Sequence, residues 1–100
     1  DWGRDNPGWG WDECLAAYRA MEDNEAGADD WRGAGGPLFV SANRTGLHPL
    51  VNQYVAACAE AGLAENDDFN GARQEGAGVY QMTIKGARRN SAARASCGLP

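Results

Sequence analysis

The residues best suited to acid–base or nucleophilic chemistry in this 100-residue chain are its single histidine and one serine. His48 directly precedes Pro49, where a helix is expected to begin, so we interpret His48 as a capping or surface residue rather than a catalytic base. Ser91 is better explained as a helix cap, because the chain holds no second histidine that could activate its hydroxyl. We therefore expect no catalytic residue within the chain.

Acidic and cysteine residues show no pattern typical of a metal site. The pairs at 29–30 and 67–68 are adjacent acids in expected loops, where carboxylates are usually solvated. The three cysteines are far apart and match neither a zinc spacing nor a disulfide framework: Cys14, Cys58 and Cys97. We expect no metal, and this cysteine usage suits a reducing compartment.

Two glycine-rich stretches, at 33–36 and 76–78, superficially resemble phosphate-binding loops. Neither has the G-x-G-x-x-G spacing between an expected strand and a capped helix, so we interpret both as turns and expect no cofactor-binding residue here. Four tryptophans could form an aromatic ligand box, but packing around an amphipathic helix explains them more simply: Trp2, Trp9, Trp11 and Trp31.

The charge distribution argues against a nucleic-acid partner. The formal net charge is −5, and the basic cluster near the end is too small for a phosphate-neutralising surface: Lys85, Arg88, Arg89 and Arg94. The chain has neither a signal peptide nor an apolar run of about 18 residues, so we expect a cytoplasmic location. The tripeptide at 43–45 fits a glycosylation acceptor, which we interpret as a chance match.

The expected helices position these residues. A first helix over about 12–24 should be capped by Asp12. It would end in the acidic run 22–25, which is unfavourable to the helix macrodipole and predicts a compensating partner, such as an arginine, from outside the chain. A second helix over about 47–61 has Pro49 in its first turn and Gly62 just past its end. A third should start at about 91–96, capped by Asn90 or Ser91.

Short strands are expected between these helices. The stretch 38–40 and the β-branched and aromatic run 79–84 favour extended structure. Asn70-Gly71 should form a tight turn in the left-handed region. Composition and pattern together predict one α+β unit with about three helices and two or more short strands, with a core that is thin for its length.

Four motifs in order resemble the glucose–methanol–choline (GMC) oxidoreductases, most closely choline-dehydrogenase-like members. They are Asn-Pro-Gly-Trp-Gly-Trp at 6–11 with the downstream Tyr18-Arg19 and Glu-Asp-Asn-Glu at 22–25, Gly-Gly-Pro-Leu at 35–38 with Val40-Ser41, Asp-Phe-Asn-Gly at 68–71 before a glycine-spaced strand, and Gly-Ala-Arg-Arg-Asn-Ser-Ala-Ala-Arg-Ala at 86–95. The resemblance covers nearly the whole chain.

This resemblance implies an internal segment of a larger enzyme. Residues 1–36 would be the tail of the flavin-binding domain, and residues 37–100 would begin the substrate-binding domain with its antiparallel sheet. The parent would bind FAD and transfer a hydride to it from a primary alcohol, choline-like or other, while a histidine from elsewhere takes the hydroxyl proton. The partners would be the remainder of the parent and a small alcohol, and this segment alone should be inactive.

The resemblance also places the strand containing Tyr80 and Met82 in the sheet of the substrate-binding domain. Alternate residues of a strand share a face, so these two side chains lie opposite Val79, Gln81 and Thr83. We hypothesise that the Tyr80/Met82 face lines or supports the alcohol pocket, with plain packing as the alternative. For the whole chain, the alternatives are a stand-alone α+β interaction module, an inactive remnant, or, on net charge only, an acidic-surface binding protein for a basic partner.

Overall fold

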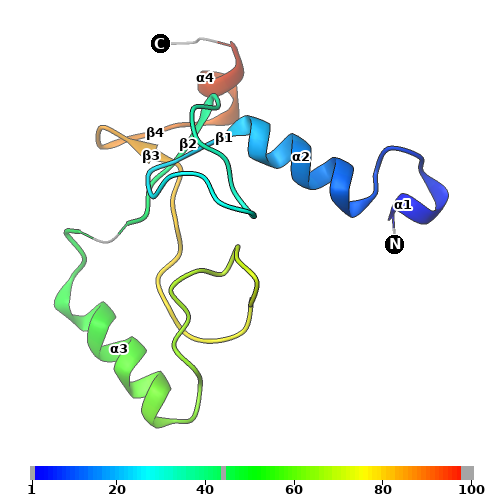
Figure 1. The fold of residues 1–100 in the computed structure, drawn as a ribbon. Helices are drawn as coiled ribbons and strands as arrows, with labels where there is room; N and C mark the ends of the chain where they lie inside the picture. The colour runs from blue at the N-terminus through cyan, green and yellow to red at the C-terminus, as the bar shows by residue number, and fades with distance from the viewer. Residues whose placement is uncertain (1, 44, 98–100) are drawn as a thin grey trace. The chain divides into compact units, whose positions relative to one another are not determined.

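The computed structural model describes residues 2–43 and 45–97, and within them an α+β chain of four helices and four short strands. In order these are α1 (Trp2–Asp5), α2 (Trp11–Met21), β1 (Glu22–Asn24), β2 (Leu38–Val40), α3 (Pro49–Glu60), β3 (Ile84–Lys85), β4 (Arg88–Arg89) and α4 (Ala92–Cys97) (Figure 1). The predicted class is confirmed.

The chain forms two compact units. Unit 1 combines the residues up to Ser41 with those from Thr83 onward, and unit 2 comprises residues 42–82. The boundary predicted between residues 36 and 37 concerns the domains of a larger protein, and it stays a prediction.

Helix α2 of unit 1 begins and ends earlier than predicted. Its N-cap is Gly10, in an extended conformation and without a side-chain cap, while Asp12 lies inside the first turn. The helix ends at Met21, because Glu22 turns to an extended backbone at φ −85° and ψ 140°. The prediction of helix as far as residue 24 is therefore wrong: residues 22–24 form β1, which pairs in parallel with β2.

The acidic residues of β1 are compensated within the chain. Glu22 Oε2 accepts the N–H of Gly33 at 3.3 Å, and Asp23 Oδ1 accepts that of Gly35 at 2.9 Å. Asp23 Oδ2 also lies 3.7 Å from the Nζ of Lys85. The expected compensating partner from outside the chain is therefore replaced by two backbone N–H groups and a lysine of unit 1.

The β3–β4 hairpin and α4 complete unit 1. The strand predicted over 79–84 is present in β3 only at its last residue, and Ile84 and Lys85 pair with Arg89 and Arg88. Gly86 and Ala87 connect the strands with φ of 55° and 60°, the positive pair typical of a two-residue hairpin turn. Ser91 Oγ then accepts the N–H of Arg94 at 3.3 Å, so Ser91 caps α4 as predicted.

Helix α3 of unit 2 agrees closely with its prediction. His48 caps it, with Nδ1 accepting the N–H of Leu50 at 3.2 Å, and Pro49 occupies the first helical position. At the other end Gly62 has φ 94°, its N–H bonds to the carbonyl of Ala59, and the N–H of Leu63 bonds to that of Cys58. This is the Schellman arrangement that a glycine past the helix end permits.

The described residues bury no hydrophobic side chain completely. The buried residues are Gly33 and three polar or charged residues, namely Asn24, Arg32 and Asn66, whereas twelve large hydrophobic residues are exposed. Hydrogen bonds therefore organise both units more than an apolar core does. No helix in the described part of the chain is long and apolar enough to cross a membrane.

Candidate functional site

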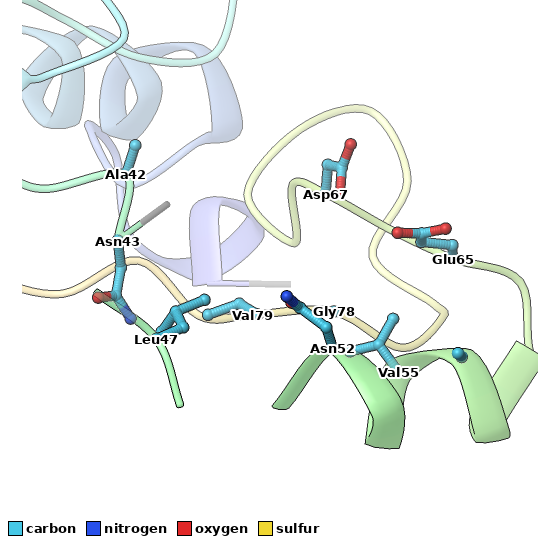
Figure 2. A pocket seen from close by; sticks show the side chains of 10 residues that line it. Ala42, Asn43, Leu47, Asn52, Val55, Glu65, Asp67, Gly78 and Val79 are labelled. Carbon is cyan, nitrogen blue, oxygen red and sulfur yellow. The ribbon is translucent and has the colours of Figure 1, made fainter. Parts of the chain in front are cut away.

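Unit 2 contains a hollow of about 380 Å³ (Figure 2). Its wall mixes aliphatic side chains with two amides and two acids: Ala42, Asn43, Leu47, Asn52, Val55, Ala56, Glu65, Asp67, Gly78 and Val79. All ten residues belong to one compact unit, so its own packing sets the geometry of the hollow.

Four stretches supply this wall: the chain before α3, α3 itself, residues 65–67 and residues 78–79. Asn52 and Val55 extend from α3, whose capped ends fix the helix, and Leu47 comes from the chain just before it (Figure 2). Glu65 and Asp67 come from the loop that follows α3. This combination can hold a small molecule with an apolar body and polar groups, which amide and carboxylate side chains orient.

The loop that carries the two acids is organised around Asn66. The Nδ2 of this buried side chain donates to the carbonyls of Arg73 at 2.8 Å and Glu75 at 3.1 Å, while its Oδ1 accepts the N–H of Asp68 at 2.9 Å. The backbone of Asn66 also bonds to Ala77. Sequence reasoning missed this residue, because a single asparagine in a turn-rich stretch carries no signal that it will be buried.

Neither glycine-rich stretch fits a flavin pyrophosphate. In the first, the N–H groups of Gly33 and Gly35 already bind the carboxylates of Glu22 and Asp23. In the second, a Cβ on Gly78 would overlap the carbonyl oxygen of Asn66. In both stretches the glycines therefore allow the close approach of backbone segments.

The Asp-Phe-Asn-Gly turn forms differently from its prediction. Neither Asn70 nor Gly71 has a positive φ. Instead Asp68 Oδ1 accepts the N–H of Asn70 at 3.1 Å, and the Asp68 carbonyl accepts that of Gly71 at 3.4 Å. A side-chain cap on the turn has replaced the left-handed geometry.

Tyr80 and Met82, the predicted pocket residues, lie beside the hollow rather than in its wall. Tyr80 is 70% exposed, and its ring centroid is 4.9 Å from that of Phe69. Met82 is 44% exposed, and Val79, from the opposite predicted face, lines the hollow instead. Their assignment to an alcohol pocket stays a prediction.

The remaining candidates have structural roles. His48 and Ser91 each cap a helix. The cysteines are free thiols, with Cys14 and Cys58 partly buried and Cys97 exposed. Across residues 2–43 and 45–97, no group of three or more histidine, cysteine or acidic side chains could hold a metal ion.

Comparison with known proteins gives one consistent result. A family model described as GMC oxidoreductase matches residues 1–96. The oxygen-dependent choline dehydrogenase of Brucella ovis is 40% identical over 88 residues, which cover 88% of this chain and 16% of that protein. The corresponding enzyme of Rhizobium johnstonii is 42% identical over 89 residues, again 88% and 16% of the two chains.

A solved structure agrees with these relatives. Pyridoxine 4-oxidase from Mesorbium loti matches 94% of this chain and 19% of its own, with a TM-score of 0.82 and 32% sequence identity. The chain thus spans less than a fifth of the length of the proteins it is similar to.

Proposed function

This chain belongs to the GMC oxidoreductase family, and we propose that it is a segment of an FAD-dependent enzyme that oxidises a primary alcohol, choline-like or other. The supporting observation is the 40% identity to choline dehydrogenases across 88% of the chain. FAD would accept the hydride from the alcohol carbon. The flavin phosphates would be held by other parts of the full-length protein, since the glycine-rich stretches here do not fit them.

Within that enzyme the segment serves as scaffold and as part of the substrate-pocket wall. The hollow of unit 2 supports this role, because it places Leu47, Val55 and Val79 beside the amides of Asn43 and Asn52. Tyr80 and Met82 follow Val79 closely in the chain, and they would contact the alcohol from outside this hollow.

The segment does not supply the catalytic base. The Nδ1 of His48 accepts the N–H of Leu50, so one ring nitrogen is committed to the cap of α3. The group that takes the hydroxyl proton would come from elsewhere in the full-length protein. The 100-residue segment by itself should therefore be inactive.

Flavin reduction in the full-length protein tests this function. The purified protein is mixed anaerobically with choline, with other primary alcohols and with pyridoxine, and the visible absorbance of oxidised flavin is followed. We expect at least one alcohol to bleach the flavin, and more slowly when its reacting carbon carries deuterium. A protein that binds no flavin, or whose flavin no alcohol reduces, would overturn the proposal.

The alternative, a self-contained interaction module, has less support. A module that folds by itself needs a closed core, yet no hydrophobic residue of the described ranges is fully buried. The exposed apolar side chains fit a segment that packs against further chain.

A further inference from the structure

Helix α3 carries an apolar surface wider than unit 2 covers. At about 3.6 residues per turn, Leu50, Tyr54, Ala57 and Ala61 fall on one stripe along the helix and its C-cap. Val51, Val55 and Cys58 form the neighbouring stripe. We call the first set the outer stripe and the second the inner stripe.

The two stripes differ in exposure. Every residue of the inner stripe is partly buried within unit 2. In the outer stripe Leu50 is 62% exposed and Tyr54 is 72% exposed, and both alanines are exposed as well. Unit 2 therefore covers the inner stripe of this helix and leaves the outer stripe exposed.

The outer stripe also lacks the charges of a solvent-facing surface. Glu60 is the only charged residue of α3, and it lies with Gln53 beside the outer stripe rather than within it, while Asn52 lies on the far side of the helix. A surface helix normally places charged and polar residues toward water and apolar residues toward a partner. Ala57 and Ala61 have no side chain beyond Cβ, so a packed partner can approach the helix closely at one end of the stripe.

We propose that the outer stripe packs against an apolar surface of the same polypeptide, contributed by residues outside these 100. This inference rests on the proposed function, in which the chain is a segment of a longer enzyme. The relatives supply the argument for this occupant, because the chain spans only 16% of their length.

A second copy of the chain fits less well. A stable protein–protein interface needs about 800 Å² from each partner, more than two large side chains and two alanines provide. Packing within one polypeptide needs no such area, because the covalent connection gives a high effective concentration.

Thiol accessibility in the full-length flavoprotein tests this packing. Tyr54→Cys and Gln53→Cys are compared in a background without other reactive cysteines, and the rate of maleimide labelling is measured under native conditions. The two positions are adjacent in the chain and about 100° apart around the helix, with Gln53 at the polar edge of the outer stripe. We expect position 54 to react roughly tenfold more slowly than position 53, or slower still, and at the same rate after denaturation.

A second pair of variants tests the same surface through stability. Leu50→Glu should lower the melting temperature of the full-length protein, whereas Gln53→Glu should leave it nearly unchanged. Equal labelling at positions 53 and 54, or equal melting temperatures for the two glutamate variants, would overturn the proposal. If the protection of position 54 disappears on dilution together with dissociation of a dimer, the stripe packs against a second copy. That result would also overturn the proposal.

Failure of the proposed function would look different. If no alcohol reduces the flavin while position 54 stays protected, the assigned reaction is wrong and the packing stands. If alcohols reduce the flavin while position 54 labels freely, the packing is wrong and the function stands.

Discussion

Arg32 lies against Asp29, with the guanidinium Nε 2.8 Å from the carboxylate Oδ2 and the arginine side chain buried in unit 1. The other carboxylate oxygen accepts the backbone N–H groups of Trp31 at 2.8 Å and Arg32 at 3.0 Å. One carboxylate therefore both closes the turn at 29–32 and pairs with the buried cation.

The ionisation of Asp29 should make the stability of this turn depend on pH. Desolvation raises the pKa of Asp29, but the hydrogen bond from Trp31 and the pairing with Arg32 outweigh it, so the pKa lies below its ordinary 3.8. A lowered pKa in the folded state means that the ionised form stabilises the fold well above pH 3.8 and that this stabilisation is lost as the pH falls through the folded pKa.

Thermal unfolding of the wild type and of Asp29→Asn, followed from neutral pH downward, measures this effect. We expect the wild type to be the more stable at neutral pH, and the difference to shrink as the pH falls below 3.8. A difference that is constant over the whole pH range would contradict a role for the charge.

Gly33 should tolerate no side chain. A Cβ there would overlap the carbonyl oxygen of Arg19, which belongs to the backbone of α2 and cannot rotate away. We expect Gly33→Ala to cost about 1–3 kcal/mol or more in unfolding free energy, through forced backbone movement. Ala34→Ser, at the exposed neighbouring position, is the matched control and should stay within about 0.5 kcal/mol of wild type. Equal denaturation midpoints for the two variants would refute the close approach.

Asn66 should be essential for the loop that carries Glu65 and Asp67. In Asn66→Asp a carboxylate oxygen would replace the Nδ2 that donates to the carbonyls of Arg73 and Glu75. Each carbonyl left without a donor costs about 1–3 kcal/mol. Hydrogen exchange at the amide of Ala77, which bonds to the Ala64 carbonyl, should accelerate strongly.

The control for Asn66→Asp is Gln74→Glu, which adds the same charge at an exposed position of the same loop. It should leave the exchange rate of Ala77 near the wild-type value. If both variants exchange alike, charge rather than the missing amide donor controls the loop.

His48 should matter for helix stability and not for chemistry. His48→Ala removes the acceptor for the N–H of Leu50 and should destabilise the protein by about 1 kcal/mol, whereas His48→Asn keeps a capping oxygen and should lose less. In the full-length protein both variants should retain the rate at which an alcohol reduces the flavin. A rate loss of several orders of magnitude at unchanged melting temperature would show instead that His48 is a catalytic base.

Helix α3 could be predicted because local residues determine its ends, whereas β1 could not, because it depends on contacts with residues far along the chain. Pro49 and Gly62 mark the ends of α3 through their own backbone preferences, so the prediction needed no tertiary information. Glu22 and Asp23 have weak strand propensity, and β1 forms because β2 pairs with it and because glycine N–H groups eleven and twelve positions away bind its carboxylates. The resemblance identified the family but could not show such contacts.

The converse error concerns residues 79–83, of which only Met82 forms a β-bridge. Val79 and Tyr80 favour extended structure, yet a β-strand is defined by a paired neighbour, which composition cannot provide. The turn at 68–71 is fastened to this stretch by side chains, with the rings of Phe69 and Tyr80 in contact and Asn70 Nδ2 3.5 Å from Gln81 Oε1. The sequence pattern of neither stretch indicates that these side chains will contact one another.

Tyr80 and Met82 give the sharpest test of the pocket-wall hypothesis. If their side chains contact the alcohol in the full-length enzyme, the double variant Tyr80→Ala/Met82→Ala should raise KM or lower kcat for alcohols, and bulky alcohols should be affected differently from small ones. Removing an interaction that is equally strong in the ground state and the transition state raises KM alone. Removing an interaction that forms only in the transition state lowers kcat.

The matched control uses the alternate positions of the same stretch. Gln81→Ala/Thr83→Ala changes two neighbouring side chains on the opposite predicted face and should leave both constants nearly unchanged. Because Tyr80 packs against Phe69, a loss of stability could mimic a loss of binding. Tyr80→Phe separates the two effects, since it keeps the ring contact and removes only the hydroxyl.

If KM and kcat for every alcohol stay at wild-type values in the double alanine variant, these residues are not part of the pocket. The wall facing the substrate would then be sought at Val79, which already lines the hollow of unit 2.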